Sequence, residues 1–297
     1  MERKEIMPIL FVGHGTPMNA VEENEFSSAW KKLGRELPLP KAILCVSAHW
    51  MADGSSVTAM EHPETIHDFG GFPHKLYEQQ YPAPGSPELA EKIRSSLKDF
   101  NIAKDYDWGL DHGAWSVLRH MYPEAGIPVV QLCIDYTKDM SYHYDLGRAL
   151  SFLRERGILI IGSGNMVHNL MMARWKGSEI DNGFAYDWAT ELNEKIKEAI
   201  VRGDHQELID YESISEHARQ GIPTEDHYIP LIYMLGLQAD GDAVTFFNDK
   251  VVGGSISMTS MIFGNYTNIV SSSLRSNSSS FARISASSAV IVDVVAM

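Results

Sequence analysis

The chain has 297 residues, of which 44% are hydrophobic and 22% charged, the composition of an ordinary globular protein. Its formal net charge of -14 argues against nucleic acid and anionic membrane surfaces as partners. The sequence has no apolar run of about 18 residues and no signal-peptide pattern, so we expect no membrane association and a cytoplasmic location. Cys45 and Cys133 lie in apolar, strand-like runs, where buried reduced thiols are expected.

Strand-like and helix-like stretches alternate along the first 264 residues. Short apolar runs bounded by turn residues predict buried strands at 9–12, 42–47, 57–60, 129–134 and 157–161, followed by two late strands, at 243–247 and 255–258, that we expect to be adjacent. Helical patterns occupy 22–36, 87–99, 114–121, 141–155 and 183–201. Ser86 and Pro87 form a typical helix start. This alternation predicts an α/β fold, a single domain with a mainly parallel central sheet and helices on both faces.

Histidines follow several of these strands directly. His14 ends the run VGH after the first strand, and His49 stands in SAHW after the second. Ligands of open α/β sheets bind outside the carboxyl ends of the strands, so both imidazoles are expected to face one pocket. His168 follows the glycine-containing run GSGNMVH, and His227 lies in TEDHYIP, where we expect an amphipathic helix to begin with Thr224 as its N-cap. Because imidazole is the commonest protein ligand for transition metals near neutral pH, this pattern predicts a metal site.

A long segment, residues 62–74, is expected to form a loop next to this pocket. It contains three histidines, but the apolar residues between them, including Phe69 and Phe72, favour the wall of a small-molecule pocket over a second metal cluster. His112, in LDHG before a helix, is placed to hydrogen-bond an anionic substrate oxygen; the alternative is a structural role, in which it caps that helix or satisfies a loop carbonyl. The sequence contains no GxSxG elbow, dinucleotide fingerprint, phosphate-binding loop or CxxC motif, which excludes several common mechanisms.

The segments GHGTPM, SAHW, HDFGGFP with the following LYEQQYPAPG, LDHGAW, GSGNMVHN and EDHYIPL occur in this order. Together, over residues 7–261, they resemble the LigB-like (class III) extradiol ring-cleaving dioxygenases, in the DOPA 4,5-dioxygenase branch. The resemblance implies an enzyme that binds a small-molecule catechol such as L-DOPA at one divalent metal ion per chain and opens its ring with O2.

The resemblance also implies roles for individual residues. His14, His49 and His227 correspond to metal ligands. His168 lies at the position of the acid-base histidine and is a candidate fourth ligand. His112 matches a histidine that contacts the substrate and takes part in catalysis, and Phe69 and Phe72 would line the ring pocket.

One departure concerns the metal. Protocatechuate-type members supply a glutamate as third ligand, whereas this chain has His227, preceded by Glu225 and Asp226. Fe(II) is expected for O2 chemistry, but an all-imidazole site also suits zinc, which would then occupy it. The alternatives are a zinc-dependent hydrolase that uses a metal-bound hydroxide with His168 as base, and a non-catalytic metal or small-molecule binder.

The last segment, residues 265–297, differs in composition from the rest. It contains ten serines and only three charged residues, Arg275, Arg283 and Asp293. Segments with so little apolar surface to bury remain disordered, so we expect a catalytic domain at 1–264 and a disordered or atypical tail after it. The sequence carries no signal for an oligomeric state.

Overall fold

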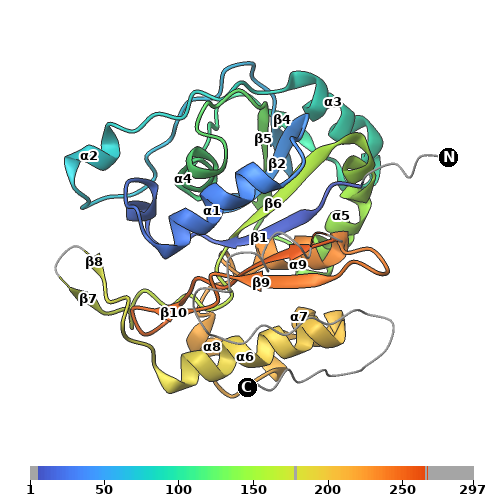
Figure 1. Ribbon diagram of the computed structural model, residues 1–297. Helices are drawn as coiled ribbons and strands as arrows, with labels where there is room; N and C mark the ends of the chain where they lie inside the picture. Colours follow the sequence, from blue (N-terminus) through green and yellow to red (C-terminus); the bar gives the residue numbers. More distant parts are fainter. Residues whose placement is uncertain (1–5, 177–178, 265, 267–297) are drawn as a thin grey trace.

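The computed structural model describes residues 6–176, 179–264 and 266, and the predicted tail at 267–297 lies outside them. An eight-stranded mixed sheet runs through the centre in the order β4-β3-β5-β2-β6-β1-β12-β9 (Figure 1). Its strands are β1 (Ile9–Gly13), β2 (Ala42–Ala52), β3 (Ser56–Thr58), β4 (Ala103–Asp105), β5 (Val129–Asp135), β6 (Ile158–Gly164), β9 (Val244–Phe247) and β12 (Ser260–Phe263). The four central strands β5, β2, β6 and β1 are parallel, and β12 and β9 extend the sheet in antiparallel pairs. The predicted mainly parallel central sheet is confirmed.

Helices cover both faces of the sheet because its central strands are apolar on both sides. In β1, Ile9 and Phe11 point into one buried cluster, whereas Leu10 and Val12 point into the other. The first cluster is covered by α3 (Pro87–Ser96), α5 (Met140–Ala149), α6 (Asp187–Arg202) and α9 (Ile229–Leu237). The second is covered by α1 (Glu25–Glu36) and α4 (His112–Met121). Shorter helices are α2 (His74–Tyr77), α7 (His205–Ile209) and α8 (Ala218–Gly221).

Several local predictions hold. Ser86 caps α3 by accepting a hydrogen bond from the Leu89 amide, with Pro87 as the first helical residue. Cys45 and Cys133 are free and buried. The helix expected over 141–155 starts at Met140 and changes after Ala149 into a 3-10 helix, Leu150–Arg156. No helix in the described part of the chain is long and apolar enough to span a membrane.

Two local predictions are wrong. The late strand β11 (Ile256–Ser257) pairs with β10 (Val251–Val252), while β9 pairs with β12, so the two late strands that we expected to be neighbours are not. Thr224 does not cap a helix: α9 begins only at Ile229, and no side chain caps it. All nine residues of α9 are buried, because α9 packs against the sheet and α5, with α7 on its outer side (Figure 1). An enclosed helix of this kind shows no amphipathic pattern in the sequence.

Strand β2 is longer than predicted. It continues past Ser47 to Ala52, and its pairing with β5 shifts register between Val46 and Met51. His49 lies within this irregularity instead of after the strand. Bulges re-aim side chains at the ends of strands, and His49 stands at such a position.

Candidate metal centre

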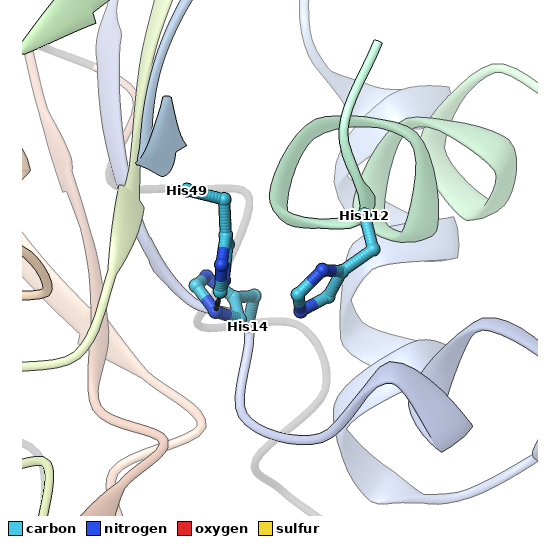
Figure 2. Close-up of side chains that lie close together, drawn as sticks. All are labelled: His14, His49 and His112. Atoms are coloured by element: carbon cyan, nitrogen blue, oxygen red, sulfur yellow. Dashed lines mark hydrogen bonds between the residues drawn. The ribbon is translucent and has the colours of Figure 1, made fainter. Parts of the chain in front are cut away.

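Histidines from widely separated segments meet at the carboxyl ends of β1, β2 and β6. The ring centroids of His14, His49 and His227 are 5.0–5.3 Å apart in each pair. The His112 ring lies 3.9 Å from that of His49 and 5.6 Å from that of His14, and Figure 2 shows it extending from α4 toward both. The predicted convergence of these imidazoles is therefore a feature of the fold.

The distance between two ring nitrogens fits a shared metal ion. Nε2 of His14 and Nε2 of His49 are 3.1 Å apart. Two imidazole nitrogens bound to one ion at about 2.0–2.1 Å, in tetrahedral or octahedral geometry, lie roughly 3.0–3.4 Å from each other. The two side chains are thus spaced as ligands of one ion.

Hydrogen bonds fix the proton of His14 on the nitrogen that faces away from this point. The Ser163 hydroxyl donates to the Gly113 carbonyl at 2.6 Å, so its oxygen is left to accept a hydrogen bond from Nδ1 of His14 at 3.0 Å. Nε2 of His14 therefore keeps its lone pair. His227 follows the same rule, because its Nδ1 contacts the Asp226 carboxylate, which only accepts. A ligand imidazole whose other nitrogen is held in this way is typical of metal sites.

Asp68 joins His112 to His49. Its Oδ1 accepts a hydrogen bond from the His112 backbone amide at 2.8 Å, and its Oδ2 lies 2.9 Å from Nδ1 of His112. The same Oδ2 lies 3.5 Å from Nδ1 of His49. His112 does not cap α4: Asp111 does so, by accepting from the Ala114 amide at 3.1 Å. The capping alternative for His112 is therefore wrong.

Burial keeps four of the imidazoles neutral, those of His14, His49, His168 and His227. It lowers the pKa of His14 and of His227 well below the ordinary value, and repulsion from the neighbouring imidazoles adds to the effect. Burial also lowers the pKa of His49 to about 3 and that of His168 to about 4. Burial opposes ionisation of Asp68, but the hydrogen bonds that it accepts from the ring and the backbone amide of His112 lower its pKa overall. Neutral imidazole is the form that binds metals.

His168 lies beside His227 with its ring stacked on it. The centroids are 3.5 Å apart and the planes differ by 10°. The lone pair of an imidazole nitrogen lies in the plane of its ring, so two parallel, stacked rings do not direct their lone pairs at one point. His168, Asp226 and His227 are nonetheless close enough to form a second group of potential ligand atoms.

The two glycines of the run before His168 lie against the segment that carries His227. A Cβ on Gly164 would lie 2.2 Å from the His227 carbonyl oxygen, and one on Gly162 would lie 2.6 Å from the Pro230 carbonyl oxygen. Both glycines therefore let β6 approach the backbone that carries His227. The Asn165 amide donates to the same His227 carbonyl at 2.9 Å.

Of the two predicted pocket phenylalanines, Phe69 is the one in contact with the histidines. Its ring meets His112 edge-on at 5.5 Å, and Phe72 packs against Phe69 at 5.6 Å. His67 and His74 point elsewhere, to the Gln79 carbonyl and to Glu78 respectively. Within residues 6–176, 179–264 and 266, the groups of potential metal ligands contain none of the loop histidines.

Sequence reasoning gave no role to the residues that hold the histidines. Asp68 and Ser163 lie inside the motifs HDFGGFP and GSGNMVHN, and Asp226 drew notice only for its charge. A carboxylate within one or two residues of a histidine can accept a hydrogen bond from its ring, and Asp226, next to His227, could have been recognised in this way. No sequence signal connects Asp68 with His112 or Ser163 with His14, because these pairs are distant in the chain.

Comparison with known proteins identifies the family of the chain. The family model described as the catalytic LigB subunit of aromatic ring-opening dioxygenase matches residues 7–264. A 4,5-DOPA dioxygenase extradiol of Escherichia coli (strain K12) is 45% identical over 262 residues, covering 87% of this chain and 95% of that protein. The protein of the same name from Beta vulgaris is 36% identical over 264 residues, with 87% and 97% covered.

A solved structure shares the fold of the chain. The crystal structure of an uncharacterized Escherichia coli K12 protein matches with a TM-score of 0.75 and 41% identity, covering 87% of this chain and all of the other. The chain therefore belongs to the LigB family of aromatic ring-opening dioxygenases, and it is an enzyme of the extradiol type.

Proposed function

We propose that this enzyme opens the ring of a catechol, L-DOPA, between carbons 4 and 5 with O2. The observation that carries the proposal is the pair of Nε2 atoms of His14 and His49, 3.1 Å apart. The substrate is suggested by the relatives from Escherichia coli and Beta vulgaris, both of which are named 4,5-DOPA dioxygenase extradiol.

His14, His49 and His227 are the residues that would hold the metal. Their ring centroids are mutually about 5 Å apart, and supports at Nδ1 leave Nε2 of His14 and of His227 with a lone pair. When bound, Fe(II) supplies the redox chemistry with O2 that zinc lacks. Three neutral ligands leave the full positive charge of the ion available to an anionic catechol, and the same three ligands also accept zinc.

His168 would move the protons of the reaction. Its ring makes no side-chain hydrogen bond to the described residues, and because it stacks parallel on the His227 ring, the two rings do not direct their lone pairs at one point. A neutral imidazole takes a proton on one nitrogen and returns one from the other, and such catalysis is typically worth roughly 10²–10⁴-fold. We therefore assign His168 as the acid-base residue and not as a fourth ligand.

His112 and Phe69 would orient the substrate. The Phe69 ring borders His112 edge-on, so a catechol ring beside the metal would contact an apolar edge on one side and the imidazole on the other. Phe72 would support Phe69 from behind.

Oxygen consumption tests the proposed function directly. Protein stripped of metal and reloaded anaerobically with Fe(II) should consume O2 when L-DOPA is added, whereas zinc-loaded protein should not. With ¹⁸O2, mass spectrometry should find both oxygen atoms in the product, and NMR should place the break between carbons 4 and 5. Ring cleavage at another bond would refute the regiochemistry, and Fe(II)-loaded protein that consumes no O2 with any catechol would refute the proposal.

We also propose that residues 1–264 form the catalytic domain and that the serine-rich segment after it takes no part in catalysis. The described structure adds one detail. The Tyr266 hydroxyl donates to the Ile6 carbonyl at 3.1 Å, and the Tyr266 ring packs on the buried cluster below α1 and α4. The part of the chain that packs on the catalytic domain therefore extends at least to Tyr266.

A further inference from the structure

Asp68 contacts His112 at two points, with one carboxylate oxygen on the backbone amide and the other on the ring. We propose that Asp68 is a positioning residue, which fixes the tautomer of His112 so that Nε2 accepts a hydrogen bond from a protonated hydroxyl of the substrate. The catalytic consequence rests on the proposed function, whereas the tautomer does not.

The tautomer of His112 follows from which of the contacting groups can donate a hydrogen bond. The backbone amide of His112 donates to Oδ1 of Asp68 at 2.8 Å, and Oδ2 lies 2.9 Å from Nδ1 of the same residue. An ionised carboxylate only accepts, so Nδ1 of His112 carries the hydrogen. With that hydrogen on Nδ1, the neutral tautomer of the ring carries its lone pair on Nε2, at the end that extends toward His14 and His49 (Figure 2). A hydroxyl can donate to that nitrogen, but a deprotonated oxygen cannot.

The segment around Asp68 is anchored so that its carboxylate stays in place. His67, one residue before, contacts the Gln79 carbonyl through Nε2 at 2.9 Å. Phe69, one residue after, packs against Tyr77 at 5.1 Å and against His112 at 5.5 Å. The Asp68 side chain itself is only 15% exposed. A carboxylate anchored on both sides is suited to orienting an imidazole, as in other dyads of a base and an orienting acid.

Asp68→Asn reverses the tautomer while keeping the shape of the side chain. The His112 amide still needs an acceptor, so the amide oxygen of the new side chain takes the place of Oδ1. Its NH₂ group then faces Nδ1 of His112 and donates to it, which moves the ring hydrogen to Nε2. His112 would then present a donor to the substrate where the wild-type protein presents an acceptor.

The experiment combines a structural readout with kinetics. Long-range ¹H–¹⁵N NMR of the zinc-loaded protein should find His112 as the Nδ1–H tautomer in the wild type and as Nε2–H in Asp68→Asn. In the Fe(II)-loaded enzyme with L-DOPA, kcat of this variant should fall by roughly 10²–10⁴-fold, as for other wrong-tautomer substitutions, while KM changes much less. Metal content should equal that of the wild type. Asp107→Asn, which makes the same change of charge at an exposed residue, is the matched control and should leave all four quantities unchanged.

Several outcomes would overturn the proposal. The proposal fails if His112 of the wild-type protein carries its hydrogen on Nε2, and this result needs no variant. It also fails if Asp68→Asn shows the reversed tautomer but keeps the wild-type kcat. Loss of metal from this variant would also overturn it, because Asp68 would then be acting through His49, whose Nδ1 is 3.5 Å away. If the wild type opened no catechol, the proposed function would fail, but the NMR measurement would still decide the tautomer.

Discussion

Gly164→Ala should damage the metal centre without touching any ligand side chain. Gly164 is the last residue of β6, and it lies against the backbone of His227. The added methyl group would be 2.2 Å from the His227 carbonyl oxygen, whereas ordinary van der Waals contact begins at 3.4 Å. Backbone atoms lie on both sides of this contact, so the β6 end and the His227 segment must separate by about 1 Å.

The size of the effect follows from this displacement. Forcing an extra methyl group into a packed interior costs typically about 1–3 kcal/mol of unfolding free energy. The hydrogen bond from the Asn165 amide to the His227 carbonyl, 2.9 Å long, would be stretched as well. Because His227 would move relative to His14 and His49, we expect metal affinity to fall about 10–100-fold, the range seen when the supports of metal ligands are removed.

Two measurements test this prediction. Urea unfolding of the metal-free protein gives the change in stability, and competition with a chromogenic chelator gives the zinc affinity. Gly126→Ala is the matched control, because a Cβ there meets nothing within 4 Å, and its stability should change by less than about 1 kcal/mol. A Gly164→Ala protein that binds zinc as tightly as Gly126→Ala would refute the argument that close approach of β6 positions His227.

Four further predictions concern the ligands, the base, the chain end and pH. His14→Ala and His49→Ala should each abolish metal retention, measured by elemental analysis after dialysis; wild-type metal content in either would remove that residue from the site. His168→Ala should keep most of its Fe(II) and lose ring cleavage by about 10²–10⁴-fold, whereas loss of the metal would make it a ligand and normal turnover would make it part of the scaffold. Truncation after Tyr266 should leave the melting temperature and activity nearly unchanged, and a large fall would show that the remaining residues dock on the domain. Acid should destabilise the metal-free protein: the pKa of His49 is lowered to about 3 and that of His168 to about 4, so between about pH 6.5 and 4 the unfolded chain binds protons that the folded one does not. Urea titrations should show stability falling by up to about 1.4 kcal/mol per pH unit for each such histidine, and stability independent of pH across that window would contradict the burial of these rings.

The sequence was most informative where a property is local. Buried parallel strands are continuous apolar runs, so β1, β5 and β6 were predicted to within one or two residues at their starts. The predicted end of β1 gave the position of His14, and the pocket was expected there because ligands of parallel sheets bind at the carboxyl ends of the strands. The fold class and the meeting of the histidines could therefore be predicted from the order of the residues alone.

What the sequence did not show depends on contacts between distant residues. The irregular end of β2 reads as a loop, because SAHWMA has no strand pattern, and only its pairing with β5 defines it. The start of the buried helix α9 could not be predicted for the same reason, because its burial depends on the elements packed around it and not on its own residue pattern. The hydrogen bond between Ser163 and His14 spans 149 residues, and no local signal marks it.

The position of β1 in the sheet affects how the chain must fold. β1 lies between β6 and β12, so its two neighbours come from residues 158–164 and 260–263. During synthesis the first strand must therefore wait for nearly the whole domain to leave the ribosome before both of its edges are paired. Pairings across such long stretches close slowly and leave apolar strand edges exposed in the meantime. His14 at the end of β1 and His227 just before α9 are similarly far apart in the chain, so the metal centre can form only after most of the domain has been synthesised.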